Sequence, residues 1–228
     1  MLFHIPQVLT HVQVEEIRGR LASAAWIDGR VTAGHQSALA KNNLQLAEGD
    51  PLALELGAQV RAALKANTLY FSAALPQCVF PPLFNRYGVG HGFAAHIDNA
   101  VRYDRTGQLV QAVRTDLSAT LFLSSPEEYD GGELVIEDAF GAQRIKLPAG
   151  DLLLYSATSV HRVESITRGE RFASFFWVQS LVRDAGEREL LFQLDVAIRK
   201  LGAANAENSA RVELTGVYHN LLRRWAEV

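Results

Sequence analysis

The most informative scarcity in this 228-residue chain is cysteine, because Cys78 is the only one. A lone cysteine excludes an intrachain disulfide framework and a four-cysteine zinc site, and it favours a reducing compartment. Long apolar runs are also absent, since no stretch approaches the roughly 20 residues that a membrane-spanning helix needs. The first ten residues lack the basic and apolar regions of a secretory signal. We therefore expect a soluble, cytoplasmic protein that has no membrane partner.

An excess of charge of one sign is lacking as well. The chain has 22 basic and 25 acidic residues, which gives a formal net charge of −3, and neither sign forms a long block. This balance disfavours a nucleic-acid partner that is bound through its phosphate backbone. The hydrophobic fraction of 48% is that of an ordinary globular protein, and the chain is long enough to bury one sizeable core. One main domain with an appendage is the expected organisation.

The chain has three regions that differ in the pattern of their apolar residues. Residues 1–76 contain a capping-box pattern at Thr10 and an Asp-Pro pair at 50–51, each followed by an apolar stripe at helical spacing. Residues 77–180 consist of short apolar or alternating runs between clusters of Gly, Pro, Asp and Ser, which is typical of antiparallel strands. Two apolar stripes at helical spacing return in residues 181–228.

This order predicts a mainly β protein with flanking helices. The strand spacing favours a sandwich or a double-sheet jelly roll over alternating parallel units. We expect the N-terminal helices of residues 1–76 to pack on the sheet and residues 77–180 to form the jelly-roll core. The two C-terminal helices are expected to pair as a hairpin against the sheet.

The residues that carry chemistry begin with His96 and Asp98. Positions i and i+2 of an extended segment project from the same face, so the imidazole and the carboxylate reach one metal ion. The third ligand must come from elsewhere, and His161 starts a predicted strand that a folded-back sheet brings close. Two imidazoles and one carboxylate form the facial triad of non-haem iron(II) oxygenases. A His-x-Asp pair alone is a weak signal, and a loop histidine beside a solvated aspartate is the plainer interpretation.

Arg171 favours the metal-site interpretation over a loop histidine beside a solvated aspartate. If residues 167–169 close a hairpin, His161 and Arg171 lie on one face of neighbouring strands. A 2-oxo acid that chelates iron beside His161 extends its distal carboxylate several ångströms away, and a planar guanidinium suits that carboxylate. The alternative is a surface ion pair between Arg171 and Glu164 or Glu170. The aromatic residues that follow Arg171 favour a buried strand instead.

Further polar residues lie close to the triad in the sequence. Asn99 and Arg102 either shape the substrate mouth and support the metal ligands or represent ordinary loop polarity. His91 lies between two glycines and is either substrate-facing or merely exposed. The glycines at positions 88, 90 and 92 do not predict a dinucleotide site, because their spacing is G-x-G-x-G and no βαβ unit surrounds them.

Several motifs, in their order along the chain, resemble a known family. They are Asn85-Arg86-Tyr87, the run from Gly88 to Asn99 with its His-x-Asp pair, Gly131-Gly132-Glu133-Leu134, Ser159-Val160-His161-Arg162-Val163 and Gly169-Glu170-Arg171. Together they resemble the prolyl-4-hydroxylase-like dioxygenase superfamily and, within it, the bacterial PKHD-type (PiuC-like) hydroxylases. The resemblance covers most of the chain and is densest from residue 78 to residue 180.

The resemblance implies a double-stranded β-helix, which is a jelly roll, that binds iron(II) through His96, Asp98 and His161. It implies that Arg171 holds 2-oxoglutarate and that Tyr87, upstream of the first histidine, also contacts it; a core aromatic with a satisfied hydroxyl is the alternative for Tyr87. The implied reaction uses O2 to hydroxylate a substrate while 2-oxoglutarate is decarboxylated to succinate and CO2. L-ascorbate is the expected reductant.

The substrate stays open at this point, because a prolyl residue of a protein and a small molecule related to iron uptake both fit the resemblance. The rival functions are a non-catalytic metal-binding jelly roll and a zinc hydrolase that uses the same ligands. Neither rival needs a cation such as Arg171 in register with the last histidine. We expect a dioxygenase domain over residues 1–180 and a helical extension over residues 181–228 that offers a surface for a homo-oligomer.

Overall fold

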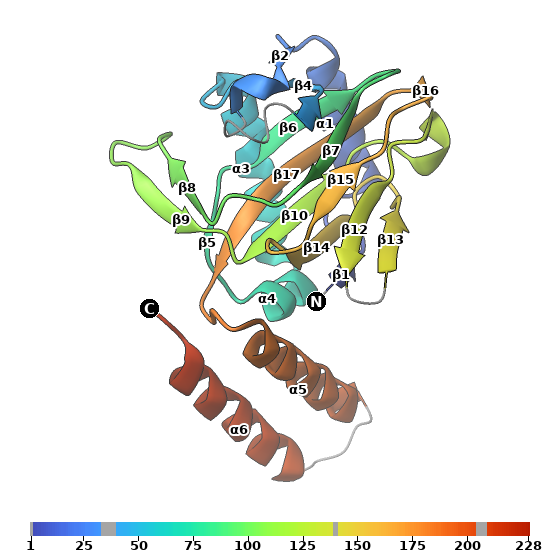
Figure 1. Cartoon of the computed structure of the whole chain (residues 1–228). Helices are drawn as coiled ribbons and strands as arrows, with labels where there is room; N and C mark the ends of the chain where they lie inside the picture. Colours follow the sequence, from blue (N-terminus) through green and yellow to red (C-terminus); the bar gives the residue numbers. More distant parts are fainter. Residues whose placement is uncertain (1, 33–39, 139–140, 204–208) are drawn as a thin grey trace.

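Two antiparallel sheets form the centre of the computed structural model, which describes residues 2–32, 40–138, 141–203 and 209–228 (Figure 1). The larger one, the major sheet, has the order β1 (Leu2–Ile5), β14 (Leu152–Ser156), β10 (Leu117–Phe122), β17 (Arg171–Ser180), β6 (Leu83–Tyr87), β4 (Leu44–Gln45) and β2 (Ile27–Asp28), with β5 (Pro76–Val79) paired to β17. The minor sheet has the order β13 (Gly141–Ile145), β12 (Leu134–Asp138), β15 (His161–Val163), β7 (Gly92–His96) and β3 (Lys41–Asn42). Two small ribbons join β8 (Val101–Asp104) to β9 (Gln111–Arg114) and β11 (Tyr129–Asp130) to β16 (Arg168–Gly169).

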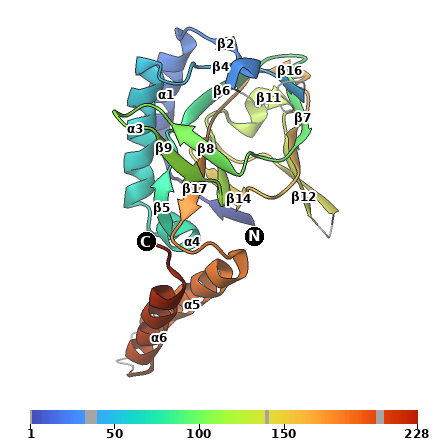
Figure 2. The ribbon, with the colours of Figure 1, turned by 60° about the vertical axis from the view of Figure 1, so that its left-hand side comes forward.

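Helices cover the face of the major sheet that is turned away from the minor sheet. Figure 2 shows α1 (His11–Ala22) and α3 (Pro51–Ala66) on this side, and α4 (Thr68–Ala74) follows α3. Ile17, Leu56 and Val60 of these helices belong to the same buried cluster as Leu121 and Phe176 of the sheet. The central strand β10 is buried along its whole length because helices lie on one side of it and the minor sheet on the other. The layers confirm the predicted jelly roll with flanking helices.

Both predicted helix starts are confirmed. The hydroxyl of Thr10 accepts a hydrogen bond from the backbone N–H of Gln13 at 3.3 Å, and the Gln13 side chain accepts one from the backbone N–H of Thr10 at 2.9 Å. The carboxylate of Asp50 accepts from the backbone N–H of Leu52, and Pro51 is the first residue of α3. Each cap pairs backbone donors that the first turn of a helix leaves without an intrahelical partner.

The expectation of a helical region over residues 1–76 needs correction, because the described part of it also contains β1, β2, β3 and β4. These strands are two to four residues long, which is too short to show an alternating pattern in the sequence. They extend existing sheets instead: β1 pairs with β14, β4 with β6, and β3 with β7. The last of these pairings brings a residue of the N-terminal region to the site described below.

The C-terminal helices α5 (Ala185–Ala203) and α6 (Ser209–Trp225) pair as predicted, but Figure 1 shows them below the sheets and not over a sheet face. Helix α5 contacts α4 and β1, since Ser72 donates a hydrogen bond to Asp195 at 2.6 Å and the rings of Phe3 and Phe192 have centroids 4.4 Å apart. The major sheet has no room for them because the N-terminal helices already cover that face. No described helix is both long and apolar enough to cross a membrane.

Candidate active site

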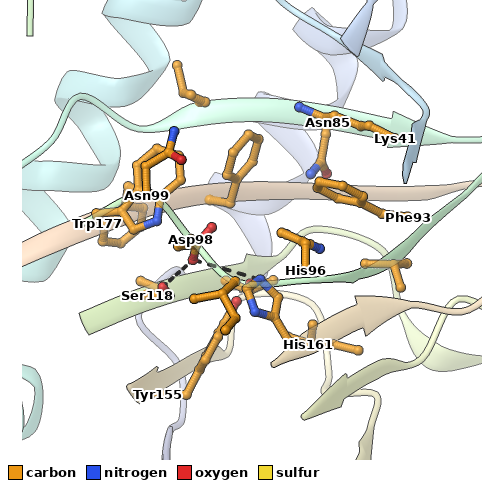
Figure 3. A pocket seen from close by; sticks show the side chains of 18 of the residues that line it. Lys41, Asn85, Phe93, His96, Asp98, Asn99, Ser118, Tyr155, His161 and Trp177 are labelled. Carbon is orange, nitrogen blue, oxygen red and sulfur yellow. Dashed lines mark hydrogen bonds and ion pairs between the residues drawn. The ribbon is translucent and has the colours of Figure 1, made fainter. Parts of the chain in front are cut away.

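A pocket opens between the two sheets, and residues from both sheets line it (Figure 3). The minor sheet supplies His96 at the end of β7 and His161 at the start of β15, and Asp98 follows β7. The major sheet supplies Tyr87 at the end of β6 and Arg171 at the start of β17. Seven of the eight site residues expected from the sequence therefore line one pocket, with Asn99 and Arg102 completing the set.

His96, Asp98 and His161 come together because β7 and β15 are antiparallel neighbours in which His161 lies opposite His96. One ligand atom from each of the three residues lies within 4.8 Å of the other two. The Nε2 atom of His161 is 3.8 Å from Oδ2 of Asp98, and the centroids of the two imidazole rings are 4.2 Å apart. Two imidazole nitrogens and a carboxylate oxygen at this separation are a donor set for one transition-metal ion.

Backbone carbonyls hold both imidazoles in the same tautomer. Nδ1 of His96 is 2.9 Å from the carbonyl oxygen of Ala94, and Nδ1 of His161 is 3.1 Å from that of Ser159. A carbonyl oxygen only accepts, so in each ring Nδ1 carries the proton and donates it. The lone pair of each neutral ring is then on Nε2, which is the atom that a metal requires.

The protonation of His96 and the orientation of Asp98 also fit a metal site. Burial, followed by the neighbouring His161, lowers the pKa of His96 to about 4, so that its ring is neutral at pH 7. The hydroxyl of Ser118 on β10 donates a hydrogen bond to Oδ2 of Asp98 at 2.5 Å. Such a partner fixes the carboxylate in one rotamer. Figure 3 shows this contact beside the close approach of Oδ2 of Asp98 to Nε2 of His161.

Arg171 approaches the same pocket from the major sheet and is only 1% exposed. It lies opposite Tyr87 across the β17–β6 pairing, and its guanidinium carbon is 5.4 Å from the Tyr87 ring centroid and 5.3 Å from that of Phe122. Its Nε atom is buried and has no hydrogen-bond partner. A buried guanidinium with a donor left over is costly unless an anion binds there. Burial raises the pKa of Tyr87, so the phenol stays protonated and able to donate beside Arg171.

The structure corrects the expected route by which Arg171 reaches His161. The strands β15 and β17 do not form a hairpin, because β15 pairs with β12 and β7 in the minor sheet and β17 pairs with β10, β6 and β5 in the major sheet. The intervening β16 pairs with β11, and a Cβ atom on Gly169, which has a φ of 72°, would lie 2.0 Å from the carbonyl oxygen of Glu128. The turn therefore crosses from one sheet to the other, and Arg171 faces the triad across the pocket.

The alternative of a surface ion pair for Arg171 is wrong. Glu170 pairs with Arg86, and Glu164 pairs with Arg144 and Arg162. Arg171 is thus available to the pocket, and its neighbours there are aromatic rings.

The remaining expected residues occupy two different places. Asn99 and Arg102 line the pocket; the guanidinium of Arg102 lies over the rings of Phe80 and Trp177 and forms an ion pair with Glu48. His91 is not among the described residues that line the pocket. Its backbone N–H donates to the carbonyl oxygen of Gly88, and its Nδ1 accepts from the backbone N–H of Gly88 at 3.2 Å, so it closes the turn before β7.

Sequence reasoning missed several pocket residues. Asn85 lines the pocket with a buried Oδ1 that has no hydrogen-bond partner, and the spacing to Tyr87 on the same strand is a signal that could have found it. Lys41 lies far from the motifs in the sequence and no local pattern marks it. Five further aromatic residues belong to the walls, namely Phe93, Tyr155, Phe175, Phe176 and Trp177.

Two family models match the chain. The 2OG-Fe(II) oxygenase superfamily matches residues 82–179, and the PKHD-type hydroxylase C-terminal domain matches residues 185–227. A PKHD-type hydroxylase of Xanthomonas campestris pv. campestris (strain B100) is 58% identical over 228 residues and one of Phenylobacterium zucineum is 57% identical over 229, with 100% of both chains covered in each case.

Solved structures share the fold at lower identity. A prolyl-4-hydroxylase of Pseudomonas putida is 20% identical, with a TM-score of 0.52 over 78% of this chain and 92% of that one. A prolyl hydroxylase of Trichoplax adhaerens, in complex with a peptide of the hypoxia inducible factor, is 15% identical, with a TM-score of 0.53 over 83% and 86%. HygX of Streptomyces hygroscopicus, with nickel, 2-oxoglutarate and hygromycin B bound, is 15% identical, with a TM-score of 0.52 over 77% and 81%.

The full-length relatives and the two family models agree with the pocket between the sheets. The chain belongs to the PKHD-type hydroxylases, which are iron(II)- and 2-oxoglutarate-dependent dioxygenases.

Proposed function

We propose that this pocket binds iron(II) through His96, Asp98 and His161, binds 2-oxoglutarate through Arg171 and Tyr87, and hydroxylates a substrate at its open end. The observation that carries the proposal is the buried, unpartnered Nε of Arg171, which shares one pocket with three metal-ligand atoms of the opposite sheet. A zinc hydrolase or a non-catalytic metal site has no use for this anion site.

The residues present fit the two groups. The Nε2 lone pairs of the histidines and the carboxylate of Asp98 would hold the metal ion, and three protein donors would leave it able to bind further ligands from the pocket. Arg171 offers a planar donor set for the distal carboxylate of 2-oxoglutarate, and Tyr87 offers a phenol donor beside it. When bound, iron(II) with 2-oxoglutarate supplies the oxidising chemistry that places one oxygen atom of O2 in a C–H bond of the substrate.

The protein itself positions and shields the reactants. Ser118 holds the carboxylate of Asp98, and the backbone carbonyls hold both imidazoles, so the ligand set needs little reorganisation before it binds the metal. The apolar and aromatic walls exclude water from the site, which strengthens the electrostatic attraction between Arg171 and a carboxylate.

Two substrate classes belong to the proposal, a prolyl residue of a protein and a small molecule related to iron uptake. The Trichoplax adhaerens enzyme carries a peptide and HygX carries hygromycin B in their structures, so the fold accommodates either kind of ligand. Incubation of the loaded enzyme with proline-containing peptides and with small-molecule extracts, followed by mass spectrometry for the gain of one oxygen atom, separates the two classes.

Anaerobic reconstitution tests the reaction class. We expect that iron(II) and 2-oxoglutarate together produce a weak charge-transfer band in the visible region, and that addition of O2 releases succinate. A sample loaded with zinc(II) is the control and should show neither signal. Omission of L-ascorbate tests its proposed role, since repeated turnover should then decline faster. A fully iron-loaded protein that binds no 2-oxoglutarate would refute the assignment.

A further inference from the structure

Both ends of the helical extension over residues 181–228 contact one arginine, Arg114, the last residue of β9. Its Nη2 donates a hydrogen bond at 3.2 Å to the carbonyl oxygen of Ser180, where β17 ends before the extension. Its Nη1 donates at 2.9 Å to the carboxylate of Glu227, which follows α6. The backbone N–H of Glu227 donates in turn to the carbonyl oxygen of Leu181 at 2.7 Å. Arg114 therefore joins the start of the extension to the segment after α6.

The remaining donors of Arg114 fix its guanidinium. Nε and Nη2 donate to the two carboxylate oxygens of Asp116 at 2.7 and 3.1 Å, and the side chain of Asp116 is only 7% exposed. Oδ2 of Asp116 also accepts from the backbone N–H of Ser180 at 2.8 Å. Each of the three guanidinium nitrogens thus has an acceptor. A planar donor set that is bound at several points is a more rigid connection than an isolated exposed ion pair.

The arginine belongs to residues 99–116, which we call the mouth segment because Asn99 and Arg102 within it line the pocket. The segment contains the β8–β9 ribbon, which projects from the side of the two sheets (Figure 1). Arg102 lies opposite Val113 in this ribbon. Val113 is fully buried in one cluster with Trp177, which also lines the pocket. The base of the ribbon is therefore part of the pocket wall.

The residue after the arginine holds the loop that follows the proposed metal ligand Asp98. The backbone N–H of Thr115 donates to the carbonyl oxygen of Ala100 at 3.0 Å, and its hydroxyl donates to that of Asn99 at 2.5 Å. Three consecutive residues, at positions 113, 114 and 115, therefore contact the pocket wall, the extension and the loop after Asp98.

The rest of the ribbon is poorly supported by other strands. Among the described strands, β8 and β9 pair only with each other. Between them, Leu109 is 85% exposed and Val110 is 63% exposed. A two-stranded ribbon is only marginally stable by itself in water. The order of the mouth segment therefore depends on the contacts at its base, where the extension is bound.

We propose that the helical extension holds the mouth segment in place, and that Arg114 transmits this effect as a positioning residue. Arg114 is not among the described residues that line the pocket, and neither is any described residue of the extension. The extension thus acts on the pocket indirectly, through Glu227 and Ser180. The inference goes beyond the proposed function and does not depend on the metal ion or co-substrate that the pocket binds.

Hydrogen–deuterium exchange of residues 99–116, measured on the intact chain by mass spectrometry, tests the proposal. We expect exchange in Arg114→Gln to be at least about 10-fold faster than in the parent, because a network of several bonds is lost. Glu227→Gln should accelerate it by about 3-fold, since one exposed charge partner contributes little. Arg114→Lys keeps the charge without the planar donor set, so its rate should lie between those of the parent and Arg114→Gln. Glu213→Gln and Arg223→Gln, at exposed positions of α6, are the matched controls and should leave the rate unchanged.

A double variant tests whether Glu227 acts through Arg114. In the Arg114→Gln background, Glu227→Gln should change the exchange rate by less than about 1.5-fold, because residues that act through one contact are not additive. Additive effects would overturn the assigned route. Unchanged exchange of residues 99–116 in Glu227→Gln, or faster exchange confined to residues 209–228, would refute the proposal. Circular dichroism verifies folding. The Glu227 side chain is 49% exposed, so Glu227→Gln keeps the test decisive even if Arg114→Gln does not fold.

Discussion

The two sheets that meet at the pocket bury their functional side chains to different degrees. The minor sheet and the loop after it carry the triad, of which His96 and Asp98 are half-buried and only His161 is buried. The major sheet carries Arg171 and Tyr87, each 1% exposed, in the interior of the protein. The proposed metal ion would arrive from solvent, so the residues that would bind it tolerate exposure. A carboxylate is held tightly only where water does not screen the attraction.

The difference teaches that the site is an interface between two preformed surfaces. Each sheet orders its own residues by backbone pairing: His161 opposite His96 in one, and Arg171 opposite Tyr87 in the other. The metal and anion sites should therefore be separable by mutation, and the following predictions test how far that separation holds.

The largest effect is expected from His161→Ala on the minor sheet. Loss of this ligand should weaken iron(II) binding by more than about 100-fold, since removal of even an outer partner of a metal ligand costs 10- to 100-fold. Anaerobic metal titration measures the affinity, and circular dichroism verifies that the variant is folded. A folded variant that retains the parent's affinity would show that His161 is not a ligand.

On the major sheet, Arg171→Met should weaken 2-oxoglutarate binding by at least about 30-fold, which corresponds to 2 kcal/mol for the loss of a buried charge partner. Iron(II) affinity should stay near that of the parent. Arg171→Lys keeps the charge but not the planar donor set, so its 2-oxoglutarate affinity should lie between that of the parent and that of Arg171→Met. Calorimetric titration of the iron-loaded variants gives both constants. If iron(II) and 2-oxoglutarate affinity decline together in Arg171→Met, the two sheets are not separable.

A smaller effect is expected where the sheets meet. Ser118 belongs to the major sheet, yet it donates to Asp98, which follows the minor sheet. Ser118→Ala should weaken iron(II) binding by about 10-fold, at the low end of the range for partners of metal ligands. The control is Ser125→Ala, because the side chain of Ser125 makes no capping hydrogen bond to the short helix after it. Equal metal affinities of the two variants would exclude a role for Ser118 in orienting Asp98.

The smallest effect concerns the stability of the metal-free protein. Burial lowers the pKa of His96 to about 4, below the ordinary value of about 6.5 for histidine. Between these values the unfolded chain binds a proton that the folded protein does not, so the free energy of unfolding should fall as the pH falls, by at most about 1.4 kcal/mol per pH unit. Urea denaturation with a chelator measures it. His96→Asn should show a shallower slope between pH 6.5 and pH 4, and an identical slope would contradict the assigned pKa.

Local patterns were sufficient for the elements that are marked by several residues at short range. The caps at Thr10 and Asp50 and the nearly continuous apolar run along β17 are each visible within one element, so the sequence displays them directly. Strands of two residues, such as β3, have no such pattern, because their register comes from a neighbour that is distant in the sequence. The expectation for residues 1–76 was incomplete for this reason.

In the candidate site too, features marked by local patterns were predicted and features that depend on distant strand pairings were not. The i, i+2 spacing of His96 and Asp98 and the motif order were enough to predict residues that the structure brings to one pocket, and their roles there stay predictions. The hairpin that was expected to join His161 to Arg171 was wrong, since residues on either side of one turn can enter two different sheets. Lys41 was missed altogether, because only the pairing of β3 with β7 brings it to the pocket.

The sequence by itself determined which chemical groups the protein has for its reaction: two imidazoles, a carboxylate and a guanidinium in a recognisable order. Only the tertiary structure decided that the guanidinium faces the triad from the opposite sheet, that a carbonyl oxygen sets the tautomer of each histidine, and that a lysine from the N-terminal region enters the pocket. The physical reason is that residue type fixes the available chemistry, whereas distance, burial and hydrogen-bond partners arise from contacts between segments that are far apart in the chain.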